Sequence, residues 1–227
     1  MVEGEDAYHL LKVLRLKEGQ HFIVSDKDCT DFICEAVDTR EGSIKAKIVK
    51  SEHNRAEKAY TVHLLNAVLK GEKTDFVLQK AVEAGADKIG LFYSVRSEVK
   101  YDKAKAEKKQ RRWEKIIYEA AKQCGRGRIP ALTLYPTFKE MLASCADRGE
   151  DVIFAYEEAR GDTLRTALEQ SGDALCFIVG PVGGFDKEEV RMAKAAGAHV
   201  VTLGNRILRA ETAGIFMLSC CVYEKEL

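Results

Sequence analysis

The sequence predicts an α/β protein in which a small antiparallel β domain precedes a larger domain built on a parallel sheet. Up to about residue 52, short runs alternate apolar and polar residues between Asp or Gly turns. After residue 60, longer apolar runs alternate with helical stretches. The polar segment EHNRAEKA (52–59) separates the two textures and has no strand character, so we place the boundary between residues 55 and 56.

Three N-terminal runs predict the first domain. They read QHFIVSDK (20–27), DFICEAVDTR (31–40) and GSIKAKIVKS (42–51). Their alternation and the short turns between them are typical of antiparallel strands joined by hairpins. We expect a small sheet or barrel, preceded by a helix in AYHLLKVLR (7–15).

Six apolar runs predict the strands of the second domain: TVHLLNAVL (61–69), KIGLFYSV (88–95), ALTLY (131–135), DVIFAY (151–156), ALCFIVG (174–180) and HVVTLG (199–204). Most are joined by helical stretches, which requires right-handed crossovers and a parallel sheet. Thr137 with Glu140, and Asp186 with Glu189, have the spacing of helix caps. Thr74 is a candidate cap for DFVLQKAVEAG (75–85).

Composition excludes several classes of protein. Lys plus Arg equals Asp plus Glu, at 36 each, so any nucleic-acid contact must depend on local charge. We find no apolar run of membrane-spanning length and no signal peptide in the acidic start MVEGEDAYHL, and expect a cytoplasmic protein. The seven cysteines form no C-x-x-C pair, which favours reduced core thiols and no metal. His63, inside an apolar strand, is interpreted as structural.

The stretch LCFIVGPVGGFDKEEV (175–190) leads from a buried strand through three glycines into a capped helix. Ligands of open parallel sheets bind where strands end, and glycines let the backbone approach a ligand. A tight turn with no ligand would also explain the glycines, because the spacing matches neither G-x-G-x-x-G nor a P-loop.

Arginines mark two further segments. Arg206 and Arg209 flank a short apolar hook ahead of a helix whose first turn carries Glu211, and guanidinium groups suit phosphate. Basic residues outnumber acidic ones between Arg96 and Arg128, although most of that run reads as a solvated helix face. In CGRGR (124–128), a glycine hinge would leave Arg126 and Arg128 available for phosphate.

Six motifs in this order resemble the ribosomal RNA small subunit methyltransferase E family: HLLKVLRLKEGQ, LKGEKTDFVLQKAVEAGADKI, YSVRSEVKYDK, RWEKIIYEAAKQCGR, VGPVGGFDKEEV and LGNRILRAETA. They extend over almost the whole chain. The resemblance implies transfer of a methyl group from S-adenosylmethionine to N3 of a uridine in 16S rRNA of the small ribosomal subunit. It also implies a SPOUT-type α/β domain with a C-terminal trefoil knot over residues 56–227, preceded by a PUA-like RNA-binding barrel over residues 1–55.

The resemblance places the methyl donor among three loops of a homodimer. The implied cofactor residues are Tyr156, Glu157, Val179, Gly180, Pro181, Gly183, Gly184, Leu203, Gly204, Arg206, Ile207, Leu208 and Thr212. The candidate RNA-binding residues are His9, Lys12, Arg15, Arg96 and Arg128, with Lys12 and Arg15 expected one helical turn apart. The apolar helix AGIFMLSCCVY (213–223) is a plausible dimer face or part of the core.

The chain departs from the family pattern in four places. Val182 stands where the family has Glu in G-P-E-G-G-F, and Val95 where it commonly has Glu. Asn205 replaces a common proline, and the basic-aromatic strand that usually comes first is absent, which would leave the barrel incomplete. The lost acids keep open a catalytically degenerate RNA-binding relative.

The implied reaction requires no metal, because a sulfonium is a good leaving group and alignment of N3, methyl and sulfur is the main task. Uracil N3 carries a weakly acidic proton, so a base or a cation should help. Arg209 and Arg126 are candidates for holding phosphate or the developing anion, and Glu211 for accepting the proton. A helix-start carboxylate paired with an arginine would equally explain Glu211. A small-molecule α/β enzyme that binds phosphate at the glycine turn is the remaining alternative.

Overall fold

The computed structural model describes residues 1–40 and 42–227, which form two compact units. The N-terminal unit comprises residues 1–57 and 125–128, and the C-terminal unit comprises residues 58–124 and 129–227. The units are defined by packing, and the boundary between residues 55 and 56 stays a prediction. Within the described ranges, no helix is both long and apolar enough to cross a membrane.

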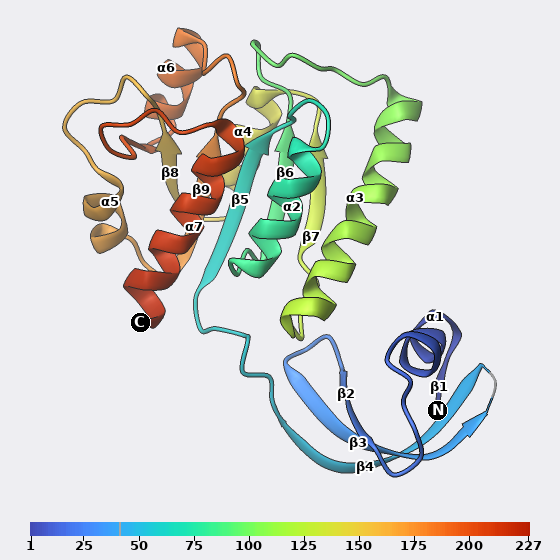
Figure 1. Cartoon of the computed structure of the whole chain (residues 1–227). Coiled ribbons are helices and arrows are strands. Elements are labelled where there is room, and N and C mark those ends of the chain that lie inside the picture. The colour runs from blue at the N-terminus through green and yellow to red at the C-terminus, as the bar shows by residue number, and fades with distance from the viewer. Residues whose placement is uncertain (41) are drawn as a thin grey trace. The chain divides into compact units, whose positions relative to one another are not determined.

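The N-terminal unit is an antiparallel sheet with a short helical segment, as the alternating runs predict (Figure 1). Its strands, in the order β1-β4-β3-β2, are β1 (Val2–Glu3), β2 (His21–Ser25), β3 (Thr30–Arg40) and β4 (Ser43–His53). Helix α1 (Gly4–Tyr8) continues into the π-helical turn η1 (His9–Val13). Ala7 of α1 is buried with one face of the sheet, beside Phe22, Cys34 and Ile44.

The end of β4 differs from the predicted linker. Glu52 and His53 still pair with β3, so the strand extends into EHNRAEKA. Asn54 is then buried, and its side-chain amide donates to Asp31 Oδ2 at 2.9 Å and to the carbonyl of Gly125 at 3.0 Å. These hydrogen bonds attach residues 125–128 to the N-terminal unit, so this segment is not a free hinge.

All six predicted strands of the C-terminal unit are confirmed in one parallel sheet. They are β5 (Thr61–Ala67), β6 (Lys88–Phe92), β7 (Ala131–Tyr135), β8 (Asp151–Ala155), β9 (Ala174–Val179) and β10 (His199–Val201). Their spatial order is β10-β8-β9-β5-β6-β7, so the chain builds outward from β5 in one direction and later returns on the other side. The order reverses between β5 and β9, which makes that point the topological switch of the sheet.

Helices cover both faces of this sheet (Figure 1). They are α2 (Lys73–Glu83), α3 (Lys103–Cys124), α4 (Phe138–Ala146), α5 (Leu164–Gln170), α6 (Lys187–Ala195) and α7 (Ala210–Glu226). Buried residues of α2, α3, α5 and α7 share one core with Leu64, whereas those of α4 and α6 share the other with Leu65. Successive strand residues thus face different cores, which explains why the strand sequences are apolar almost throughout.

Two of the three predicted helix caps are confirmed. The Thr137 side chain accepts from the backbone N–H of Glu140 at 3.1 Å. Asp186 and Glu189 form a reciprocal capping box at the start of α6. The prediction for Thr74 is wrong: α2 begins at Lys73, and the buried Thr74 hydroxyl bonds to the backbone N–H and carbonyl of Leu69.

Candidate functional site

The predicted cofactor residues lie in three loops at one edge of the parallel sheet. Residues 156–163 follow β8, residues 180–186 follow β9, and residues 202–209 follow β10. Because β10, β8 and β9 are consecutive in the sheet and parallel, their carboxyl ends and these loops share an edge. The fold therefore brings the three segments together next to the switch point.

The glycine turn has specific steric requirements. Gly184 has a φ of +68°, and its N–H donates to the Pro181 carbonyl at 3.0 Å. An added Cβ at Gly184 would meet the carboxylate of Glu157, from the loop after β8, which is exposed and could turn aside. A Cβ at Gly180 would approach the ring of Phe185 to 2.7 Å. Gly184 is thus required by its backbone conformation and Gly180 by close packing, so a turn without a ligand explains part of the motif.

The loop after β6 also reaches the glycine turn, which the sequence did not indicate. Arg96, predicted to bind RNA, donates through Nη1 to the Gly183 carbonyl at 3.3 Å and lies 3.5 Å from Asp186 Oδ2. Glu189 is almost fully buried and accepts from the Ser94 hydroxyl at 2.9 Å and from the Val95 N–H at 3.0 Å. Glu189 thus joins the start of α6 to this loop.

Val95 and Val182 occupy these two neighbouring loops and both are exposed. Val182, at 51% relative exposure, contributes little to the core. The acids that the resemblance implies at these positions would therefore face solvent near Arg96, and in this chain Asp186 is a carboxylate within ion-pair distance of Arg96.

The loop after β10 presents its arginines to solvent. Arg206 and Arg209 are exposed, and Ile207 between them is 86% exposed. Arg209 has an extended backbone and precedes α7, where its carbonyl accepts from the N–H groups of Thr212 and Ala213 at 2.9 Å. An apolar side chain this exposed beside two cations is a surface that a ligand or partner could cover.

Glu211, in the first turn of α7, pairs with a lysine rather than an arginine. Its Oε1 lies 3.2 Å from Lys73 Nζ of α2, and its Oε2 is buried without a hydrogen bond from any described residue. Burial alone would raise the pKa of Glu211, but its own backbone N–H and Lys73 hold the pKa below its ordinary value. The carboxylate is therefore ionised at neutral pH.

The remaining cofactor candidates occupy the same edge. The hydroxyl of Tyr156 donates to Glu158 Oε2 at 3.0 Å, and its N–H donates to the Val201 carbonyl at 3.0 Å. Leu203 and Leu208 are half-buried, and Gly204, with a φ of +110°, has open space where a side chain would be. Val179 and Pro181 are buried, and Thr212 is exposed on α7.

Arg126 differs from its predicted exposure on a flexible hinge. Its side chain is 3% exposed and forms an ion pair with Glu57, with Nη2 3.0 Å from Oε2. Such a buried pair is expensive to break, because an unpaired charge would remain inside the N-terminal unit. Arg128 is half-exposed and lies 3.7 Å from Asp28. The ion pair with Glu57 favours a structural role for Arg126. The side chain of Arg128 is accessible to solvent, as predicted.

The three N-terminal RNA candidates lie in or next to η1. His9 is half-buried, and Lys12 is exposed in the last turn. The expectation that Lys12 and Arg15 are one helical turn apart is wrong, because η1 ends at Val13 and Arg15 has a left-handed φ of 55°. Both side chains are nevertheless exposed.

Comparison with known proteins matches both units of the chain. Residues 56–222 match the family model of the RNA methyltransferase domain, and residues 2–56 match that of the RNA methyltransferase PUA domain. Ribosomal RNA small subunit methyltransferase E of Bacillus subtilis is 32% identical over 232 residues, covering 100% of this chain and 90% of that protein. Its namesake from Mesomycoplasma hyopneumoniae is 36% identical over 180 residues, covering 79% of this chain and 77% of that protein.

Two solved structures share the fold along almost the entire chain. A methyltransferase from Legionella pneumophila in complex with the bound cofactor SAM is 32% identical, with a TM-score of 0.84, covering 97% of this chain and 89% of that one. Ribosomal RNA small subunit methyltransferase E from Neisseria gonorrhoeae, bound to S-adenosyl methionine, is 25% identical, with a TM-score of 0.86, covering 97% and 90%. The resemblance carried by the six motifs is confirmed. With a PUA-like antiparallel half-barrel ahead of a parallel SPOUT-type α/β domain, the chain belongs to the ribosomal RNA small subunit methyltransferase E family.

Proposed function

We propose that this protein transfers a methyl group from S-adenosylmethionine to N3 of a uridine in 16S rRNA of the small ribosomal subunit. The observation that carries the proposal is the loop cluster at the ends of β8, β9 and β10, in a chain of this family. The target base follows from the resemblance of the motifs. The site geometry supports the transfer, because it gathers exposed backbone, arginines and one ionised carboxylate at a single edge.

The residues at this edge fit the cofactor. Gly183 and Gly204 are exposed, and an added Cβ at Gly204 would have no described heavy atom within 4 Å. Glu211 Oε2 is a buried acceptor without a described partner, as expected where a ligand supplies the donor. We assign the cofactor to the three loops through Tyr156, Glu157, Val179, Gly180, Pro181, Gly183, Gly184, Leu203, Gly204, Arg206, Ile207, Leu208 and Thr212. When bound, S-adenosylmethionine supplies an electrophilic methyl group on a sulfonium.

The chain's own contribution is positioning and charge. We assign Arg209 to the RNA phosphate or to the developing negative charge on the base, since it is exposed beside the loop cluster. Glu211 is ionised, and we assign it the role of accepting the proton from N3 of the uridine. Arg126 stays a candidate for the same anion, although its ion pair with Glu57 would have to open.

Exposed basic residues of both units would contact the RNA. We assign Arg96, Arg128, Lys12 and Arg15 to phosphates, because phosphate contacts position an RNA without reading its sequence. His9 is half-buried in η1 and would contact RNA only with its free edge. Binding of this kind weakens steeply with salt.

The test is methyl transfer from labelled S-adenosylmethionine to small ribosomal subunits that lack the modification, followed by mass spectrometry of the nucleosides. We expect 3-methyluridine. No product, with cofactor binding intact by calorimetry, would overturn the proposal and favour the degenerate RNA-binding relative. A different methylated nucleoside would retain the transfer and refute the assigned target atom.

A further inference from the structure

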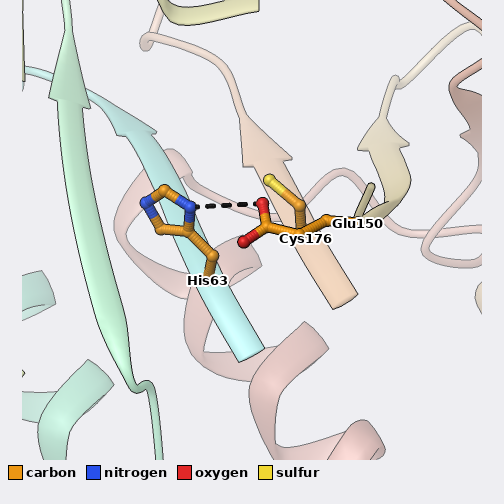
Figure 2. A group of neighbouring side chains, drawn as sticks. All are labelled: His63, Glu150 and Cys176. Atoms are coloured by element: carbon orange, nitrogen blue, oxygen red, sulfur yellow. Dashed lines mark ion pairs between the residues drawn. The ribbon is translucent and has the colours of Figure 1, made fainter. Parts of the chain in front are cut away.

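A second cluster of reactive side chains lies at the opposite edge of the parallel sheet from the glycine turn. His63 and Cys176 are each the third residue of their strands, β5 and β9, and Glu150 immediately precedes β8 (Figure 2). The glycine turn, in contrast, follows the last residue of β9. The proposed methyl transfer therefore uses none of these three side chains.

The topology itself brings the cluster together. His63 and Cys176 are register partners on neighbouring parallel strands, so their side chains leave the same face of the sheet. Helix α4 covers that face and contributes Cys145. The turn from α4 into β8 then brings Glu150 alongside, as Figure 2 shows for the three residues drawn.

The potential ligand atoms converge. One atom each of His63, Glu150 and Cys176 lies within 4.8 Å of the others, and His63 Nδ1 is 3.5 Å from Glu150 Oε2. Cys145 Sγ is 3.9 Å from Cys176 Sγ but lies outside this mutually close group of three, and its thiol contacts the Met141 carbonyl at 3.5 Å, so it would have to turn inward to become the fourth ligand. Zinc bonds of about 2.0–2.3 Å in a tetrahedron hold ligand atoms roughly 3.3–3.8 Å apart, so both measured pairs are close to that spacing.

Burial makes this convergence costly unless the polar atoms are satisfied. The side chains of His63 and Glu150 are 5% and 7% exposed, and both sulfurs belong to buried cysteines. His63 Nδ1 is buried, and its polar contact is the long ion pair with Glu150 Oε2 at 3.5 Å, with no hydrogen bond of ordinary geometry from a described residue. A cation held between this nitrogen, the carboxylate and the thiol would replace that long contact with direct coordination bonds.

Arg148 would neutralise the net negative charge that remains after a divalent cation binds to these ligands. Its Nε donates to Glu150 Oε2 at 2.8 Å, and its Nη2 donates to Cys145 Sγ at 3.5 Å. Two thiolates and one carboxylate around a divalent cation leave one negative charge, which the guanidinium neutralises. Groups that hydrogen-bond to ligands in this way orient them and are a regular part of metal sites.

We propose that His63, Glu150, Cys176 and Cys145 form a structural zinc site that closes α4 onto the amino ends of β5, β8 and β9. A set of four protein ligands with two thiolates suits zinc and has no open position for catalysis. This site differs from the sequence-based expectation of reduced core thiols and no metal. It is independent of the proposed methyl transfer.

The test uses the full chain, stripped of metal by a chelator under reducing conditions and then titrated with Co²⁺. We expect one cobalt per chain, with d–d bands of tetrahedral intensity and a sulfur-to-cobalt charge-transfer band, both removed by Zn²⁺. At about a hundred times Kd, Zn²⁺ should raise Tm by about 5–10 °C. A folded wild-type protein that gives no charge-transfer band would overturn the proposal.

Variants connect the signal to the cluster. Cys176→Ser and Cys145→Ser should abolish or strongly weaken the charge-transfer band, while circular dichroism shows whether each variant is folded. Cys221→Ser is the matched control, because Cys221 is a buried thiol of α7 that lies outside the cluster. A band lost only in Cys221→Ser would refute the assignment. So would a Cys145–Cys176 disulfide, found by peptide mapping in metal-free protein as purified.

Discussion

At the scale of single residues, Gly184 is required by its backbone conformation. Its left-handed φ costs a residue with a side chain about 1–2 kcal/mol, whereas the exposed carboxylate of Glu157 could turn aside from an added Cβ. We expect Gly184→Ala to lower the free energy of unfolding by about that amount and to weaken binding of S-adenosylmethionine. Urea denaturation and calorimetry measure the two effects.

Gly183→Ala is the matched control for this prediction. Gly183 lacks a positive φ, and an added Cβ would be 3.4 Å from Arg96 Cβ, an ordinary contact. We expect near wild-type stability. If both variants were equally stable, steric demand at Gly184 would not explain the motif.

Two substitutions distinguish a role of Glu211 in proton transfer from its structural ion pair with Lys73. Glu211→Gln removes the proposed proton acceptor, and we expect kcat to fall about 10²-fold or more. The pKa of Glu211 is held below its ordinary value, so the carboxylate stays ionised between about pH 6 and about pH 9, the range of the assay. The rate should therefore fall equally across that range.

Lys73→Met supplies the comparison, because it removes the ion-pair partner and retains the carboxylate. We expect most of the rate to survive in Lys73→Met when both variants are assayed on the same RNA. Wild-type turnover in Glu211→Gln would instead identify Glu211 as a helix-start carboxylate with no role in proton transfer.

At the scale of elements, Glu189 holds α6 and the loop after β6 in one arrangement. Its carboxylate accepts from the Ser94 hydroxyl, the Val95 N–H and the Asp186 N–H, all at 2.9–3.0 Å. Glu189→Gln replaces one acceptor oxygen with a donor, so at least one buried N–H or O–H loses its partner. We expect a loss of about 1–3 kcal/mol in unfolding free energy, measured by denaturant titration.

Glu188→Gln is the control on the same helix. Glu188 pairs with Arg191 at the surface, and its removal should leave the unfolding midpoint nearly unchanged. Equal destabilisation by the two substitutions would mean that charge at the start of α6 matters and that the bridge from Glu189 does not.

Elements were predictable where a local pattern determines them. The six strands follow from apolar runs, because helices bury the parallel sheet on both faces. Thr74 was misassigned because its hydroxyl bonds to the backbone of Leu69, five residues earlier in the loop between β5 and α2, and cap spacing does not include this local competitor. The predicted one-turn spacing of Lys12 and Arg15 was also wrong, because nothing in HLLKVLR signals that η1 ends at Val13.

At the scale of the whole molecule, pairings between distant segments could not be predicted from the sequence. Glu189 and Ser94 are 95 residues apart, and only the strand order β9-β5-β6 makes their loops neighbours. The cluster around His63 depends in the same way on the register of β5 and β9. The trefoil knot, implied by the resemblance alone, stays a prediction.

Association of two chains is the last property that belongs to this scale. Helix α7 buries Met217, Leu218 and Cys221 against the sheet, while Phe216 and Tyr223 remain 39% and 68% exposed. Being seven residues apart, these two aromatics share the outer face of the helix. We propose that this face is the homodimer interface, because exposed aromatics on one stripe are typical of interface cores.

We expect a dimer by sedimentation velocity at micromolar concentration and a monomer for the double variant Phe216→Lys and Tyr223→Lys. Two lysines from each chain would meet their symmetry mates across a two-fold interface. In the free monomer both positions are exposed on α7, and Tyr223 lies in the last turn, where a cation is favourable. Ile48→Lys, which changes an exposed apolar side chain of the N-terminal unit, should remain a dimer. A wild-type monomer would remove α7 as an interface, and a dimer that persists in the double variant would place the interface on another surface.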